Sequence, residues 1–313
     1  MHLDKSKQAL IVLLGPTAVG KTELALRLAE QMSMEIISAD SRLFYRGMDI
    51  GTAKPSLEER ARVPHHLIDV VDPDETWSLA EFQQAAKNRI EEIHQRGKYP
   101  LMVGGSGQYL RSIIEGWFPP KLAPNPLLRA ALESWAEEIG NDALHARLAA
   151  IDPGAAENID ARNLRRTLRA LEVILSTGVP FSSQRRKTES PYHNLVIGLS
   201  RPRPELYARI DARIDAMLAA GWLEEIQDLL TKGFSPNLPS MSAIGYQQLI
   251  KHIGAEISLE EAVAQIKKAT RVFVRRQANW FKPTDPAIHW FDASEPDLIP
   301  RIESMVRGTF PQN

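Results

Sequence analysis

One segment near the start of the chain constrains its fold more than any other. The apolar run Ala9-Leu10-Ile11-Val12-Leu13-Leu14 leads directly into Gly15-Pro16-Thr17-Ala18-Val19-Gly20-Lys21-Thr22, and residues 23–30 then have a helical pattern. The glycine-bounded stretch fits the phosphate-binding pattern G-x-x-x-x-G-K-[S/T], and it lies between a predicted strand and a predicted helix. We predict that its backbone amides and Lys21 bind phosphate, and that Thr22 ligates Mg²⁺.

Further apolar runs alternate with helical patterns, which predicts an α/β fold built on a parallel sheet. Strands are predicted over residues 35–41, 65–73, 99–103, 194–199 and 288–291. The strand over 99–103 ends in Gly104-Gly105-Ser106-Gly107, where a motor ATPase would carry an aspartate for Mg²⁺. This difference argues against routine hydrolysis of nucleoside triphosphates. The glycines fit either close approach by a ligand or a tight turn.

Asp40 stands near the end of the predicted strand 35–41. Because ligands of open α/β sheets bind beyond the carboxyl ends of the strands, we expect Asp40 to lie near the phosphate loop. A carboxylate there could bind a metal through water, hold a sugar or act as a general base. It could also simply cap a helix.

The pattern changes after Gly116. Phe118-Pro119-Pro120 and Pro124-Asn125-Pro126 indicate a linker, and residues 127–178 have helical character throughout. We therefore predict a discontinuous P-loop core of residues 1–116 and 190–313 with an inserted helical domain at 117–189. Its last helix, predicted over 162–176, has a basic face and an apolar face. The basic face carries Arg162, Arg165, Arg166 and Arg169, and the packed face carries Leu164, Leu168, Leu171 and Leu175.

Composition first argues against a nucleic-acid partner, because 38 Lys and Arg against 39 Asp and Glu give a net charge of −1. The charges are nevertheless segregated. Residues 161–213 contain 11 basic and 4 acidic residues, and residues 267–282 contain 6 basic and no acidic residues. Such clusters fit contact with a phosphate backbone or, alternatively, scattered surface charge.

The chain has no cysteine, which excludes disulfides, thiolate nucleophiles and cysteine-ligated zinc. No segment approaches the roughly 20 apolar residues that a membrane span needs. We expect a cytoplasmic protein with no membrane partner.

Five segments in order now carry a resemblance: the phosphate loop, Ile37-Ser38-Ala39-Asp40-Ser41, the stretch Met48-Asp49-Ile50-Gly51-Thr52-Ala53-Lys54-Pro55, His65-His66-Leu67-Ile68-Asp69, and Val103-Gly104-Gly105-Ser106-Gly107-Gln108-Tyr109. Together with Ile244-Gly245-Tyr246 and Arg275-Arg276-Gln277, they closely resemble the bacterial tRNA isopentenyltransferases, or tRNA dimethylallyltransferases, over nearly the whole chain.

The resemblance implies transfer of a dimethylallyl group from dimethylallyl diphosphate to the 6-amino group of the adenosine 3′ of the anticodon. It implies that the loop, Lys21 and Mg²⁺ hold the diphosphate, and that Arg213 helps to grip it. It also implies that Asp40 accepts a proton from the adenine amine and that Thr17 lies near the reaction centre.

For the partner, the resemblance implies the anticodon stem-loop of tRNA, with the target base extruded into a channel between the core and the helical insertion. The implied tRNA contacts are Asp40, Ser41, Arg42, Leu43, Ser106, Arg129, Arg162, Arg165, Arg166, Gly245, Tyr246, Arg271, Arg275 and Arg276. Ser242 and Gln247 are neutral where relatives often carry arginine, which puts those two contacts in doubt. Without cysteine, we do not expect the zinc finger of the eukaryotic relatives.

Three alternatives stay open at this point. An adenylate isopentenyltransferase would modify free AMP instead of tRNA. A small-molecule kinase would use the same phosphate loop with a carboxylate at a strand end. A nucleotide-dependent RNA-binding switch would need no chemistry at Asp40. We expect the protein to be a monomer.

Overall fold

The computed structural model describes residues 7–310 apart from 119, 121, 123–124 and 185. The chain forms two compact units, one of the residues up to Ile114 and from Ser190 onward, and one of Glu115–Glu189. The sequence placed these boundaries at 117 and 189. Among the helices of the described residues, none has the length and hydropathy that a membrane span requires.

The first unit is built on a six-stranded sheet in the order β3-β2-β4-β1-β7-β8. Its strands are β1 (Gln8–Leu14), β2 (Met34–Ser38), β3 (His65–His66), β4 (Tyr99–Gly104), β7 (Tyr192–Ser200) and β8 (Ile288–Asp292). All neighbouring strands run parallel, with Val12 of β1 opposite Met102 of β4 and Val196 of β7. Leu10–Leu14 are fully buried, as expected for the middle of a sheet covered on both faces. The predicted parallel α/β fold is confirmed.

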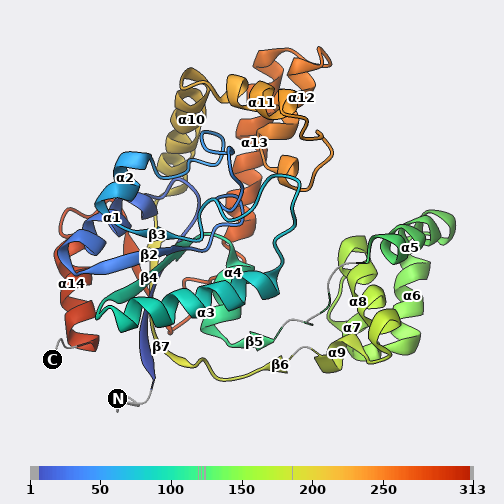
Figure 1. Cartoon of the computed structure of the whole chain (residues 1–313), viewed down its shortest axis with the longest axis horizontal. Coiled ribbons are helices and arrows are strands. Elements are labelled where there is room, and N and C mark those ends of the chain that lie inside the picture. Colours follow the sequence, from blue (N-terminus) through green and yellow to red (C-terminus); the bar gives the residue numbers. More distant parts are fainter. Residues whose placement is uncertain (1–6, 119, 121, 123–124, 185, 311–313) are drawn as a thin grey trace. The chain divides into compact units, whose positions relative to one another are not determined.

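The helices of this unit follow the predicted alternation. They are α1 (Lys21–Gln31), α2 (Leu57–Arg62), α3 (Leu79–Gln95), α4 (Gly107–Ile114), α10 (Arg203–Ala219), α11 (Trp222–Thr231), α12 (Tyr246–Ile253), α13 (Leu259–Gln277) and α14 (Leu298–Thr309), with a short 3₁₀ turn, η1 (Ser240–Ser242). Figure 1 shows α10, α11, α12 and α13 gathered at one end of the sheet. Helix α3 begins at a reciprocal capping box, in which Ser78 and Glu81 satisfy one another's backbone N–H groups.

The strand predicted over 65–73 is much shorter than expected, because only His65–His66 pair with β2. Leu67 and Asp69 adopt φ angles of 60° and 57°, which are incompatible with a continuous strand. The two histidines face different partners, the carbonyl of Val63 for His65 and the carboxylate of Glu35 for His66.

The second unit has its own core. It contains α5 (Pro126–Ile139), α6 (Asn141–Ile151), α7 (Pro153–Glu157), α8 (Leu164–Thr177) and α9 (Phe181–Gln184). Buried leucines from α5, α6 and α8 form the centre, namely Leu132, Leu144, Leu148, Leu168 and Leu171. An entirely helical unit was predicted, but the unit also contains two short strands. These strands, β5 (Trp117–Phe118) and β6 (Arg186–Lys187), pair in antiparallel fashion.

Helix α8 differs from the prediction in two respects. It begins at Leu164 rather than at Arg162, because the Asn163 side chain accepts the N–H of Arg166 and caps the helix. Leu175 is 57% exposed, so it does not belong to the packed face.

Candidate active site

The phosphate loop connects β1 to α1. Ala18 and Gly20 have φ angles of 66° and 116°, and these left-handed residues curl the backbone between them. A loop curled in this way, followed by a helix N-terminus, directs N–H groups toward a bound anion. The Lys21 Nζ donates to the carbonyl oxygens of Gly15, at 3.0 Å, and Pro16, at 2.8 Å. These hydrogen bonds hold the Lys21 side chain against the loop with which it is expected to bind phosphate.

Three charged groups converge beside this loop. Burial lowers the pKa of Lys21 to about 8, while the nearby Asp40 carboxylate raises that pKa and Arg213 lowers it. Burial likewise lowers the pKa of Arg213, with Asp40 opposing that shift and Arg209 adding to it. The mutual electrostatic effects place Lys21, Asp40 and Arg213 in one cluster. These are three of the residues for which the resemblance implies a role in the reaction.

Helix α10 supplies the arginine side of this cluster. Arg209 and Arg213 lie one turn apart on this helix. The Arg209 Nε donates to the carbonyl of Ala18, in the phosphate loop, at 2.9 Å. Arg201, just before the helix, donates to the carbonyl of Val19 at 3.2 Å. These two backbone contacts could not be predicted from the sequence, because the partners are far apart along the chain.

The segment after β2 is held in a compact turn. The Asp40 carboxylate accepts the N–H of Arg42 at 3.0 Å, and the Ser106 hydroxyl accepts the N–H of Ser41 at 3.4 Å. The Arg42 guanidinium donates to the carbonyl of Ser240 and to the hydroxyl of Ser242, both at 3.2 Å. Hydrogen bonds thus connect four of the implied tRNA contacts, namely Asp40, Ser41, Arg42 and Ser106, with Ser242.

The Met48–Pro55 stretch, which is the most specific part of the resemblance, folds around a carboxylate of its own chain. The N–H groups of Asp49, Ile50 and Gly51 all donate to Glu225 of α11, at 2.7, 2.6 and 3.2 Å. The Tyr246 hydroxyl donates to the same carboxylate at 2.6 Å. A successive run of backbone donors of this kind forms an anion-binding nest. Here the nest joins the loop to α11 and α12.

Gly245 and Tyr246 take part in this packing. Tyr246 is fully buried, and a Cβ at Gly245 would lie 2.0 Å from the ring of Trp222. Burial raises the pKa of Tyr246, and the adjacent Glu225 carboxylate adds to that shift. Gly245 and Tyr246 are thus part of the packing around Glu225 that holds the Met48–Pro55 stretch, while Gln247 beside them is exposed.

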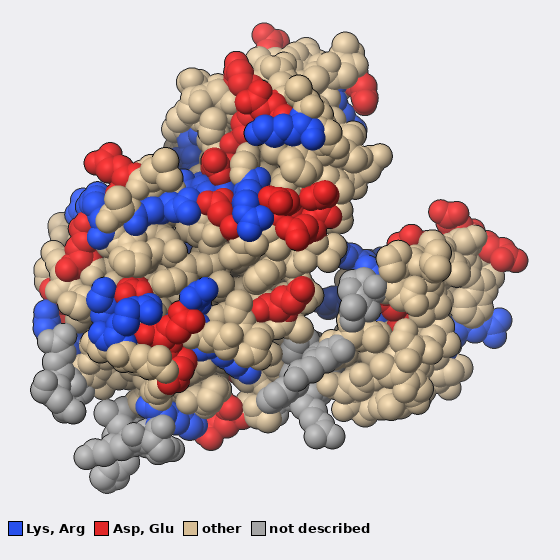
Figure 2. Space-filling view, in the orientation of Figure 1, with Lys and Arg blue, Asp and Glu red and all other residues tan. Residues whose placement is uncertain are grey.

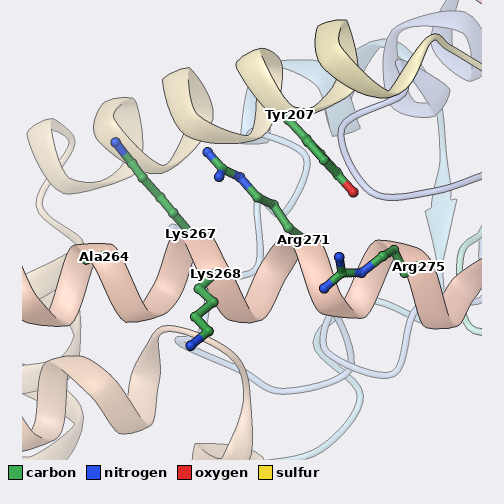
Figure 3. A pocket seen from close by; sticks show the side chains of 6 residues that line it. All are labelled: Tyr207, Ala264, Lys267, Lys268, Arg271 and Arg275. Atoms are coloured by element: carbon green, nitrogen blue, oxygen red, sulfur yellow. The ribbon is translucent and has the colours of Figure 1, made fainter.

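The basic residues of α13 divide into two groups. Lys267 pairs with Asp215 at 2.7 Å and Arg271 with Asp211 at 2.5 Å, and both acidic partners belong to α10. Figure 3 shows Lys267 and Arg271 reaching toward α10 while Lys268 points to the opposite side. A groove of about 510 Å³ runs beside them and is also lined by Tyr207 and Arg275.

Arg275 and Arg276 are exposed and have no ionic partner among the described residues. Figure 2 shows basic and acidic side chains interspersed over the visible face of the first unit, in keeping with such pairing. Arg275 and Arg276 could therefore contact an external anion, whereas Lys267 and Arg271 are neutralised by carboxylates of α10.

In the second unit, the arginines also differ in availability. Arg129 and Arg169 pair with the buried carboxylate of Glu172, at 2.5 and 2.8 Å, and Arg162 pairs with Asp160. Arg165 and Arg166 are exposed without an ion pair in the described part of the chain. The predicted row of four arginines is thus reduced to these two.

The donor set beside the loop fits Mg²⁺ held mainly by phosphate and water. The described residues contain no cluster of three His, Asp or Glu side chains that could enclose a metal. Mg²⁺ commonly takes only one or two protein ligands and fills its shell with substrate phosphates and waters. The exposed Thr22 hydroxyl, in the first turn of α1, can supply one such ligand.

A parallel sheet with a phosphate loop after β1, and with cations and a carboxylate beside that loop, defines an enzyme that handles phosphorylated substrates. Residues 43–284 match the family model described as IPP transferase. A tRNA dimethylallyltransferase of a Roseiflexus species is 52% identical over 95% of this chain and 97% of its own length. One from Thermomicrobium roseum is 46% identical over 96% and 92%.

Solved structures agree with this match. The tRNA isopentenylpyrophosphate transferase of Bacillus halodurans is 40% identical, with a TM-score of 0.72 over 96% of each chain. A eukaryotic dimethylallyltransferase acting on tRNA is 28% identical, with a TM-score of 0.80 over 96% of this chain and 79% of its own. The chain belongs to the IPP transferase family.

Proposed function

We propose that the protein transfers a dimethylallyl group from dimethylallyl diphosphate to the 6-amino group of the adenosine 3′ of the anticodon in tRNA, with release of diphosphate. The observation that carries this proposal is the cluster of Lys21, Arg213 and Asp40 beside the phosphate loop. The names of the relatives support the choice of reaction.

In the transfer, the bond between the allylic carbon and the diphosphate oxygen breaks, and a bond from that carbon to the adenine nitrogen forms. The electron pair leaves with the diphosphate, whose growing charge is met by the loop amides, Lys21 and Arg213. Fixed donors of this kind stabilise charge that develops in the transition state. We also propose that Thr17, which belongs to the same loop, lies near the reaction centre.

The adenine nitrogen must also lose a proton. An exocyclic amine is a poor nucleophile, so a positioned acceptor assists the attack. We assign this role to Asp40, whose carboxylate already acts electrostatically on both Lys21 and Arg213. When bound, Mg²⁺ would neutralise charge on the diphosphate, and we propose Thr22 as its protein ligand.

Two features favour tRNA over AMP as the acceptor. Arg165 and Arg166 of α8, with Arg275 and Arg276 of α13, offer exposed positive charge that a mononucleotide could not use. Phosphate contacts of this type dominate the affinity of proteins for nucleic acids. A kinase is less well supported, because β4 ends in glycine where a metal-binding aspartate would be expected. We further propose that the protein acts as a monomer in the cytoplasm.

The proposal is tested by offering dimethylallyl diphosphate labelled in the prenyl group, with Mg²⁺, to an anticodon stem-loop and to AMP in parallel. We expect label in the stem-loop and none in AMP. Labelling of AMP alone would replace the proposal with the adenylate isopentenyltransferase, and transfer of phosphate from ATP to a small molecule would favour a kinase.

A further inference from the structure

Gln277, the last residue of α13, joins two loops that are distant from it in sequence. Its side-chain oxygen accepts the N–H of Thr17 in the phosphate loop at 3.0 Å. Its side-chain nitrogen donates to the carbonyl of Gly105, after β4, at 3.1 Å. One amide group therefore connects the start of the phosphate loop to the loop at the end of the neighbouring strand.

An amide suits this position because it accepts and donates hydrogen bonds at once without carrying a charge. A glutamate could accept from Thr17 but could not donate to Gly105, and it would add a negative charge beside a diphosphate site. An apolar side chain would leave both backbone groups without their partner.

The glycines at the end of β4 are shaped for this contact. A Cβ at Gly105 would lie 2.4 Å from the Gln277 side-chain nitrogen, and one at Gly107 would lie 2.1 Å from the ring of Trp280. The sequence left open whether these glycines admit a ligand or form a tight turn. In the structure, they admit the C-terminal end of α13 and the residues that follow it.

The helix that carries Gln277 is itself firmly held. Two ion pairs, Arg271 with Asp211 and Lys267 with Asp215, fasten α13 to α10. Helix α10 in turn contacts the loop through Arg209, which donates to the carbonyl of Ala18. The phosphate loop is thus gripped at adjacent residues by two helices that are paired with each other.

The N–H of Thr17 is already used by Gln277, so diphosphate binding must depend on the amides that follow it. We propose that Gln277 is a positioning residue: by fixing Thr17 against Gly105, it sets the loop curvature that presents those amides to the diphosphate. This inference rests on the proposed function for the identity of the ligand, but the geometry of Gln277 can be tested without any transfer reaction.

The test compares Gln277→Leu, Gln277→Glu and the control Gln265→Leu. The control removes an amide elsewhere on α13 whose one hydrogen-bond partner in the described part of the chain is Glu261 of the same helix. Binding of inorganic diphosphate with Mg²⁺ is measured by calorimetry, and hydrogen exchange is followed in the peptide containing Thr17. For Gln277→Leu, we expect the affinity for diphosphate to fall about tenfold, which corresponds to the loss of one to two net hydrogen bonds. We also expect hydrogen exchange in the Thr17 peptide to accelerate.

For Gln277→Glu, we expect the Thr17 peptide to stay protected while the affinity falls further, with a loss that shrinks as salt is added. This variant also serves if Gln277→Leu does not fold. Unchanged exchange in Gln277→Leu, affinity within about twofold of wild type, or an equal loss in Gln265→Leu would each overturn the inference. If the wild-type protein transferred no prenyl group, the proposed function would fail, but these measurements would still decide the role of Gln277.

Discussion

The Lys21 Nζ lies 2.8 Å from the carbonyl oxygen of Pro16, within the loop to which both residues belong. Without a ligand, the Lys21 ammonium group therefore donates its hydrogen bonds to backbone carbonyls of the phosphate loop. Burial lowers its pKa to about 8 in this state, despite the favourable effect of Asp40. A bound diphosphate would favour the charged form and raise this pKa.

A pH dependence of binding follows. Below about pH 8, Lys21 is charged in the free protein, and diphosphate binds without proton uptake by this group. Above that pH, binding must protonate the lysine, so affinity falls by up to about tenfold per pH unit. Calorimetry on the wild type and on Lys21→Arg separates this effect from titration of the ligand, because arginine stays charged. Parallel pH profiles for the two proteins would contradict the prediction.

Replacing Asp40 by asparagine keeps the shape of the side chain but removes its ability to accept a proton. We expect turnover with a stem-loop to fall about 100-fold or more, the usual contribution of a general base. Binding of the stem-loop, measured by fluorescence anisotropy, should remain within a few-fold of wild type. Asp74→Asn, at an exposed position, serves as the control. Unchanged turnover in Asp40→Asn would refute the proton-acceptor role.

The nest around Glu225 predicts a graded loss of stability. Glu225→Ala removes the acceptor of three backbone N–H groups and of the Tyr246 hydroxyl, and should cost about 3 kcal/mol. Tyr246→Phe removes only one of these hydrogen bonds and should cost about 1 kcal/mol. Denaturant unfolding of both variants measures the difference. Equal losses would mean that the backbone donors of residues 49–51 contribute little.

Glu172 should govern the stability of the helical unit. Its side chain is fully buried, and burial alone would raise its pKa. Hydrogen bonds from Arg169, the Asn125 N–H and Arg129 outweigh burial and hold that pKa below its ordinary value. The stabilisation is therefore present above the ordinary value of 4.5 and is lost as the pH falls below it.

Glu172→Ala would leave two arginines without their carboxylate, and such a break typically costs about 3 kcal/mol or more. Hydrogen exchange in residues 125–177 should accelerate in this variant at neutral pH. The exposed Glu133→Ala, on α5, is the matched control and should leave exchange unchanged. Equal exchange in the two variants would show that the buried ion pairs do not hold the unit together.

Local patterns predicted much of this molecule. The apolar run at residues 9–14 and the glycine-bounded loop after it identified β1 and its connection to α1. These features depend on neighbours in the sequence. Asp40 could also be placed, because parallel strands present their carboxyl ends at one edge.

The missed features depend on contacts between distant residues or on the conformation of single residues. Nothing near Gln277 in the sequence indicates that it bonds Thr17, and nothing near Glu225 indicates that it fills a backbone nest. The strand predicted from His65 ends early because Leu67 adopts a left-handed conformation, which leucine rarely does and which the sequence therefore does not indicate. Asn163 shortened α8 by capping it, which removed Arg162 from the expected basic face.

The most direct test of the proposed function is nucleoside mass spectrometry of an anticodon stem-loop after incubation with the protein, Mg²⁺ and dimethylallyl diphosphate. We expect the adenosine 3′ of the anticodon to gain one dimethylallyl group on its 6-amino nitrogen. A stem-loop with inosine at this position, which lacks the amine, should gain none. An unmodified adenosine, or prenylation of the inosine control, would contradict the proposed function.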